Sequence, residues 1–337
     1  MRKAFITGLG GLTLSQPEAR FLAAARPAGL ILFARNCDTP DQVRRLISDA
    51  RAAIGAGDTL VLIDQEGGRV QRLRPPHWRA LPPAAMYGAI HGVDPTKGLA
   101  AARAVARLTA DDLAGLGINA NCTPVLDLPV AGSHDVIGNR AYGREPAAVA
   151  ALGRAVAEGH MAGGILPIIK HIPGHGRATS DSHLDLPVVS TSLAELEATD
   201  FAPFRALRDL PAAMTAHIVF TAVDRERPVS TSRHAMATIV RGAIGYDGLV
   251  MSDDLSMRAL AGDMAARARD VIAADCDLAL HCNGALAEME AVAGAVPALT
   301  GPALERVQRA FAATRNLTPF DRPAAEAMLA EIMSTVA

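Results

Sequence analysis

Cysteine is rare in this chain of 337 residues. It occurs at Cys37, Cys122, Cys276 and Cys282, a spacing that fits neither a zinc site nor a disulfide scaffold. The net charge is −2 and no basic cluster occurs, which argues against nucleic-acid binding. No apolar run reaches the length of a membrane-spanning helix. The chain starts with two basic residues before a short apolar stretch that glycine breaks, which disfavours a signal peptide. We therefore expect a cytoplasmic protein with no membrane partner and no nucleic-acid partner.

Lysine is also scarce, with three residues against thirty arginines. One of them, Lys170, directly follows the apolar run 165–169 and opens a segment, residues 170–187, that also holds three histidines and two aspartates. Glycine and proline in this segment indicate a loop. Because loops at strand ends carry much of the chemistry of enzymes, this loop is the first candidate for a functional site.

Short apolar runs alternate along the chain with longer amphipathic stretches. We expect strands over residues 4–7, 30–33, 60–63, 118–122, 165–169, 212–215, 249–252 and 278–280. We expect helices over residues 40–54, 97–113, 146–162, 193–207, 232–244 and 262–274. Continuous apolar strands separated by helices indicate a parallel sheet covered on both faces. Eight such units predict an α/β fold, a (β/α)8 TIM barrel, as a single catalytic domain over residues 1–337 with closing helices from about residue 301. The alternative is an open doubly wound sheet, but no Gly-x-Gly-x-x-Gly follows the first strand.

Polar residues also follow the other predicted strands, as expected for a barrel whose site lies at the carboxyl ends of its strands. Asp253 and Asp254 follow the seventh strand. Adjacent strand residues point to opposite faces, so one of the two should line the site while the other caps the following helix. A carboxylate in the site could act as a nucleophile that traps a sugar covalently. Asp181 lies two residues before His183, and a histidine paired with a carboxylate can act as a general acid and base.

A second group of residues would form a polar clamp for a ligand with many hydroxyls or a carboxylate. Its members are Asp64, Arg72, Arg140, Lys170 and His171. The alternative for each is a salt-bridge network across the barrel mouth, which we favour for Glu66 and Arg69. The four-residue spacing of His171 and His175 could bind a metal on a helix, but a proline and a glycine intervene, so we expect neither a metal nor a cofactor.

At these residues the chain resembles family 3 glycoside hydrolases, specifically the short, single-domain bacterial β-N-acetylglucosaminidases of peptidoglycan recycling. The segments that carry the resemblance are residues 29–36, 64–72, 121–127, 170–187, 214–217 and 252–257. The resemblance implies that Asp253 is the nucleophile and that His183 is the acid and base, with Asp181 as its partner. It implies that Asp64, Arg72, Arg140, Lys170 and His171 bind N-acetylglucosamine, so that the partner is a small carbohydrate, a muropeptide fragment. A monomer is slightly favoured.

Four alternatives remain open. Phosphate could replace water as the acceptor, because a neutral histidine tolerates it. The acetamido group of the substrate could be the nucleophile, oriented by Asp253 and Asp254. The site could be a metal-dependent hydrolase built on His171, His175, His217 and an aspartate. The protein could also bind sugars without turning them over. With one tryptophan among its few aromatics, the chain suits removal of one terminal sugar better than a long polysaccharide groove.

Overall fold

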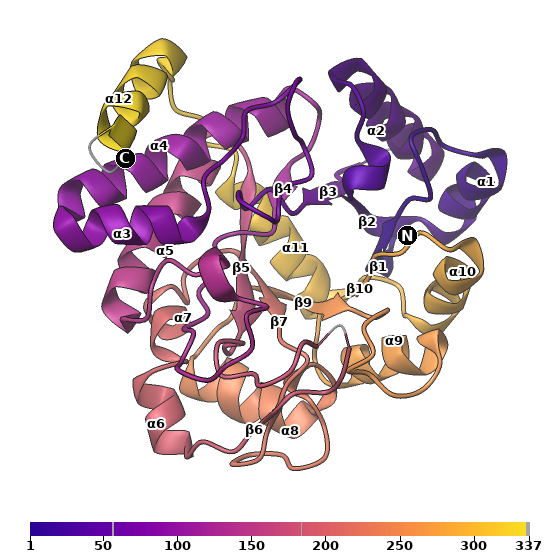
Figure 1. Cartoon of the computed structure of the whole chain (residues 1–337). Coiled ribbons are helices and arrows are strands. Elements are labelled where there is room, and N and C mark those ends of the chain that lie inside the picture. The colour runs from indigo at the N-terminus through magenta and orange to yellow at the C-terminus, as the bar shows by residue number, and fades with distance from the viewer. Residues whose placement is uncertain (56, 183, 335–337) are drawn as a thin grey trace.

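Eight parallel strands close into a barrel in the computed structural model, which describes residues 1–55, 57–182 and 184–334 (Figure 1). The order around the barrel is β1, β2, β3, β4, β5, β7, β9 and β10, closing on β1. These strands are β1 Lys3–Gly8, β2 Pro27–Leu32, β3 Leu60–Ile63, β4 Ala120–Asn121, β5 Leu166–Ile172, β7 Ala212–Thr215, β9 Leu249–Asp254 and β10 Leu278–His281. Each one overlaps a predicted strand, so the predicted barrel is confirmed.

Helices surround the barrel and follow most of its strands. They are α1 Gln16–Ala25, α2 Pro40–Ile54, α3 Ala84–Val93, α4 Pro95–Ala114, α5 Pro146–Ala162, α6 Leu193–Ala198, α7 Ala202–Ala206, α8 Arg233–Ala235, α9 Met264–Ala273, α10 Leu286–Ala295, α11 Gly301–Ala313 and α12 Arg322–Ser334. Local signals mark several starts: Ser15 and Glu18 form a capping box at α1, and Thr39 caps α2, which begins with Pro40. Within the described residues, no helix combines the length and apolarity needed to span a bilayer.

Two helix predictions were wrong in detail. The stretch 193–207 is not one helix but α6 and α7, separated at Thr199 and Asp200. The Thr199 hydroxyl donates to Asp200 and to the Glu195 carbonyl, and such local side-chain bonds compete with helix continuation. The stretch 232–244 is α8 followed by a π-helical segment, Met236–Ala243.

The strands are apolar throughout because both of their faces are buried. Ile6 and Leu62 belong to a cluster inside the barrel, whereas their neighbours Phe5 and Val61 belong to the larger cluster between the strands and the helices. Successive strand residues point to opposite faces, so a strand of a covered parallel barrel needs apolar residues at every position. This explains the continuous apolar runs of the sequence.

Helix α11 closes the amino-terminal end of the barrel. Its residues Val307 and Ala310 join the interior cluster, and Arg306 pairs with Asp277, just before β10, at 2.9 Å. Figure 1 shows α11 behind the strands. A cavity in the barrel can therefore open only at the carboxyl ends of the strands.

A small parallel sheet stands outside the barrel. Strand β6, Val188–Val189, pairs with β8, Val219–Phe220, in the register Val188 to Val219. This sheet fastens the far end of the long loop that follows β5.

Candidate active site

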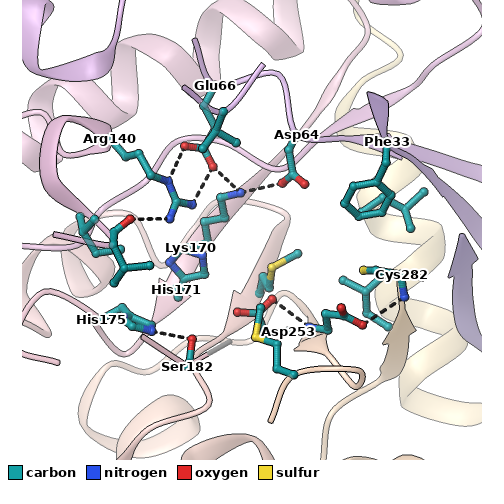
Figure 2. A pocket seen from close by; sticks show the side chains of 18 of the residues that line it. Phe33, Asp64, Glu66, Arg140, Lys170, His171, His175, Ser182, Asp253 and Cys282 are labelled. Carbon is teal, nitrogen blue, oxygen red and sulfur yellow. Dashed lines mark hydrogen bonds and ion pairs between the residues drawn. The ribbon is translucent and has the colours of Figure 1, made fainter. Parts of the chain in front are cut away.

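A cavity of about 280 Å³ lies at the carboxyl ends of the strands. Its lining among the described residues is Ile31, Phe33, Asp64, Glu66, Val70, Arg72, Val136, Ile137, Arg140, Lys170, His171, His175, Ser182, Met214, Asp253, Asp254, Met257, Leu280 and Cys282. Figure 2 shows the charged side chains converging on one space, with Phe33 on the opposite side from Arg140. The structure thus brings together six of the eight predicted site residues. Asp181 is described but is not among the lining residues, and His183 lies outside the described residues.

Lys170 is the centre of a buried charge cluster. Its Nζ atom lies 2.8 Å from Asp64 Oδ1 and 2.7 Å from Glu66 Oε1. Arg140 binds Glu66 through two contacts of 2.8 Å, and Arg72 Nη2 lies 3.0 Å from Asp64 Oδ2. A compact ammonium group can serve two carboxylates at once where a planar guanidinium would be bulkier. This accounts for a lysine here in a chain that otherwise prefers arginine.

The cluster keeps both carboxylates ionised. Burial opposes the charge on Glu66, but Lys170 and Arg140 outweigh it and lower the pKa of Glu66 to about 2. Burial likewise opposes the charge on Asp64, yet Lys170 and Arg72 hold the pKa of Asp64 well below its usual range. Burial disfavours the ammonium form of Lys170, but Asp64 and Glu66 raise its pKa above the usual value. Glu66 therefore belongs to the salt-bridge network that we predicted for it and also lines the cavity.

Asp127 organises the start of the loop after β5, and we had not assigned it a role. Its Oδ2 lies 2.7 Å from His171 Nδ1, while its Oδ1 accepts the backbone N–H groups of His171 at 3.1 Å and His175 at 2.7 Å. Burial opposes the charge, but His171 and His175 lower the pKa of Asp127 to about 2. The signal in the sequence was its position in the segment that follows the fourth predicted strand, five residues after residue 122.

Asp253 is the last residue but one of β9 and faces the cavity, and its side chain accepts the backbone N–H of Asp254 at 2.8 Å (Figure 2). It is 6% exposed, so its carboxylate reaches the cavity with little contact with bulk water. A buried carboxylate held in this way suits attack on a bound group better than ion pairing at a surface.

We expected one aspartate of the pair to line the site and considered the other as a helix cap, but Asp254 also lines the cavity and caps no helix. The next helix, α9, begins ten residues later at Met264, and its cap is Asp263. Asp254 Oδ1 instead accepts the N–H and the hydroxyl of Ser256 and the N–H of Cys282, at 2.9–3.1 Å. Asp254 thus stabilises the turn after β9 and joins it to β10.

His217, two residues after β7, contacts the same turn. Its Nε2 lies 3.1 Å from the Asp254 carbonyl oxygen, and its Nδ1 lies 2.6 Å from Ser230 Oγ. An imidazole that donates to a carbonyl from Nε2 accepts at Nδ1 when it is neutral. Burial lowers the pKa of His217, which favours that neutral form. Both ring nitrogens are therefore engaged, and the Nε2 contact helps to position the turn after β9.

The histidines do not form a metal site in the described part of the chain. No group of three or more histidine, cysteine, aspartate or glutamate side chains there has an arrangement that could hold a metal ion. His171 and His175 pack ring against ring, with centroids 5.6 Å apart at an interplanar angle of 65°.

A parallel (β/α)8 barrel with a buried carboxylate in a small polar cavity at its carboxyl end is typical of enzymes that act on small ligands. The model of the glycosyl hydrolase family 3 N-terminal domain matches residues 7–314. The chain is 43% identical over 279 residues to the beta-hexosaminidase of Methylococcus capsulatus, covering 82% of this chain and 81% of that protein. It is 40% identical over 279 residues to the beta-hexosaminidase of Bordetella avium, covering 82% of this chain and 79% of that protein.

Solved structures agree with these sequence relatives. NagZ from Neisseria gonorrhoeae, in complex with N-trifluoroacetyl-D-glucosamine, superposes with a TM-score of 0.87 at 33% identity, covering 98% of both chains. A family 3 β-N-acetylglucosaminidase from Paenibacillus gives a TM-score of 0.84 at 28% identity, covering 98% of this chain and 66% of that one. The chain belongs to glycosyl hydrolase family 3. Within that family it groups with the beta-hexosaminidases, and it is a glycoside hydrolase.

Proposed function

We propose that this enzyme is a retaining exo-β-N-acetylglucosaminidase, which removes terminal non-reducing β-linked N-acetylglucosamine. The observation that carries the proposal is the buried Asp253 carboxylate facing a small cavity ringed by the Lys170 charge cluster. A cavity of about 280 Å³ lies just below the usual range of ligand pockets, roughly 300–1,000 Å³, so it suits one sugar unit. The relatives named beta-hexosaminidase support the same substrate class.

The proposed reaction has two steps. In the first, Asp253 attacks the anomeric carbon while His183 donates a proton to the glycosidic oxygen, so that the aglycone leaves and a covalent glycosyl–Asp253 ester forms. In the second, His183 takes a proton from water, the hydroxide attacks the same carbon, and the ester bond to Asp253 breaks. Two displacements at one carbon return the original β configuration.

The assignment of His183 depends on its place in the chain, because His183 lies outside the described residues. It follows Ser182, which lines the cavity, and it comes two residues after Asp181. We propose Asp181 as the carboxylate that holds one ring nitrogen of His183, leaving the other nitrogen for proton transfer.

Sugar recognition falls to Asp64, Arg72, Arg140, Lys170 and His171. All five line the cavity, and a carboxylate accepts from sugar hydroxyls while the cations donate to them. Phe33 adds an apolar wall, stacked under the Arg72 guanidinium with Cζ 5.1 Å from the ring centroid. Because the ion pairs already fix these side chains, little ordering remains to oppose binding.

We propose muropeptide fragments, in which N-acetylglucosamine is linked to an anhydro-N-acetylmuramic acid peptide, as the natural substrate, and cell-wall recycling in the cytoplasm as the setting. The resemblance of residues 170–187 and 252–257 to recycling glucosaminidases supports the substrate. The four cysteines are free thiols, the state that cytoplasmic reductants maintain, which supports the location.

The test is nitrophenol release from 4-nitrophenyl β-N-acetylglucosaminide, with the β-glucoside as control. We expect turnover of the first and little of the second. Asp253→Ala should lower kcat by about 10³-fold or more, as loss of a nucleophile does. Asp135→Asn, which changes an exposed carboxylate paired with Arg69, is the matched control and should leave kcat unchanged. An active Asp253→Ala enzyme would refute the proposal.

Product analysis separates the alternative mechanisms. Sugar 1-phosphate formed in phosphate buffer would indicate phosphorolysis. Trapping with a 2-fluoro sugar that leaves no adduct on Asp253 would indicate attack by the substrate's own acetamido group.

A further inference from the structure

The loop after β5 reaches the cavity through Ser182. At its start, the Ala178 carbonyl oxygen accepts from His134 N–H at 2.8 Å, and Arg177 pairs with Asp200 at 2.6 Å. At the cavity, Ser182 is buried with 2% of its surface exposed. Two hydrogen bonds hold Ser182 there: its carbonyl oxygen accepts from Ala259 N–H at 3.2 Å, and its hydroxyl lies 3.0 Å from His175 Nε2.

His175 is itself fixed before it meets Ser182. Its backbone N–H donates to Asp127 at 2.7 Å, and its ring packs against the His171 ring. Burial and the neighbouring His171 lower the pKa of His175 to about 4, so the ring is neutral near pH 7 and carries one N–H. Its Nδ1 has no hydrogen-bond partner within the described part of the chain. Because a buried N–H without a partner is rarer than an unpaired acceptor, the proton belongs on Nε2, which donates to Ser182 Oγ.

The His175–Ser182 pair contributes little to the stability of the fold. Two buried polar groups give a net gain of about 1 kcal/mol when they bond to each other, and an apolar pair of the same shape can do as well. Among the described residues, moreover, nothing pairs with the buried Nδ1 of His175. Figure 2 shows the pair on the cavity wall beneath His171, on the same side of the cavity as Asp253. Its position suggests a role in the reaction.

We propose that His175 is a positioning residue: its hydrogen bond to Ser182 fixes the loop against the cavity wall and thereby sets where the next residue in the chain, His183, exchanges its proton. The proposal rests on the proposed function in one respect, the role of His183. Asp127 then has two roles. Its carboxylate binds the ring of His171, which lies at the proposed sugar site, and the backbone N–H of His175, which holds the loop. In this proposal the buried carboxylate of Asp127 supports both the sugar-binding residue and the residue that positions the proton donor.

The test compares two substrates that differ in their need for an acid. The 2,4-dinitrophenolate ion is a good leaving group and departs with little help from a general acid. Phenolate is a poor leaving group, so its departure depends on protonation of the glycosidic oxygen. We expect Ser182→Ala and His175→Ala to lower kcat/KM for phenyl β-N-acetylglucosaminide by about tenfold, the scale of one buried hydrogen bond. The value for the dinitrophenyl glycoside should change by less than about twofold, and inhibition by free N-acetylglucosamine should be unchanged. The double variant should be no worse than either single variant, because both remove the same bond.

Two control variants and a second measurement separate the loss of the His175–Ser182 hydrogen bond from general effects of substitution. Ser133→Ala removes a neighbouring hydroxyl that donates to Val130 and does not line the cavity, and Ser182→Thr restores a hydroxyl at the proposed position. Ser133→Ala should behave like the wild type on the two substrates, and Ser182→Thr should recover part of the activity on the phenyl glycoside that Ser182→Ala loses. Hydrogen exchange of the peptide spanning residues 176–186 should be faster in Ser182→Ala and His175→Ala.

The outcomes separate this proposal from the proposed function. Equal losses on both substrates, with weaker inhibition by N-acetylglucosamine, would mean that Ser182 contacts the sugar, which overturns the positioning role. Unchanged kinetics and unchanged exchange would also overturn it. If His183→Ala shows no leaving-group dependence while the exchange still rises in Ser182→Ala, the proposed acid is wrong, and with it the link from His175 to proton transfer.

Discussion

Replacing Lys170 with methionine tests whether one ammonium group holds the cavity together. Methionine keeps much of the side-chain length but removes the charge that lies 2.8 Å from Asp64 and 2.7 Å from Glu66. The two carboxylates would then face each other across a buried space, each with one arginine left: Arg72 for Asp64 and Arg140 for Glu66.

The expected cost follows from burial. Lys170 is 2% exposed, so solvent screens the interaction little. Removing one partner of a buried ion pair costs about 3–5 kcal/mol, and the remaining arginines place Lys170→Met near the lower end of that range. The same change should weaken inhibition by N-acetylglucosamine, because Lys170 lines the cavity.

The loss should depend on pH with a definite sign. In the wild type Glu66 has a pKa of about 2, below its value in the unfolded chain, so its contribution to stability is full at neutral pH and disappears as pH falls through that range. Without Lys170 the pKa of Glu66 rises and this contribution shrinks. The difference in stability between wild type and variant should therefore be full near pH 7 and decrease below about pH 4.

Urea unfolding followed by circular dichroism measures this difference. Arg44→Met is the matched control, because it breaks an exposed pair with Asp41 and should cost at most about 1 kcal/mol. If the unfolding free energy of Lys170→Met lies within about 1 kcal/mol of the wild-type value at pH 7, the ammonium group of Lys170 does not stabilise the barrel mouth.

Three further changes test other parts of the site. Asp127→Asn should lower the unfolding free energy by about 2 kcal/mol and reduce kcat, since it removes a charged acceptor of three hydrogen bonds; normal thermal stability would contradict this. Gly176→Ala should destabilise by about 2 kcal/mol in urea unfolding, because its Cβ would lie 2.0 Å from the Leu128 carbonyl oxygen, and a neutral result would show that the loop can shift. Burial lowers the pKa of His160 to about 4, so its unfolded form binds the extra proton and the wild type should lose about 2 kcal/mol from this group between pH 7 and pH 5. The slope of unfolding free energy against pH should therefore be smaller in His160→Gln, and an unchanged slope would contradict the assignment.

The sequence predicted the barrel because each strand is apolar on both faces. Residues 60–63 matched β3 without error, and the continuous run before Lys170 identified β5. The split of residues 193–207 was missed because the Thr199 hydroxyl bonds to Asp200 and to the Glu195 carbonyl, and these bonds compete with helix continuation. Apolar periodicity does not reveal where a hydroxyl within a helical stretch bonds to its own backbone.

The sequence predicted where the site lies better than it predicted which side chains contact one another there. Strand ends identified Asp64, Lys170 and Asp253 as neighbours in space, which the barrel imposes. That Glu66 also lines the cavity, and that Asp127 holds both His171 and His175, depend on the paths of loops that no local pattern fixes. The peptide bond between Lys170 and His171 is cis, which the sequence did not predict because His171 is not a proline.

The closure of the barrel has a consequence for synthesis of the chain. Phe5 of β1 pairs with Ala279 of β10, so the first strand made meets its second neighbour only after most of the polypeptide has left the ribosome. Until then β1 is an exposed edge, the kind of surface on which strands of other chains can add. Helix α11 comes later still, and the interior cluster stays open at its amino-terminal end until Val307 is in place. A nascent chain of about 270 residues would hold nearly every group of the cavity and still lack the strand that completes the barrel.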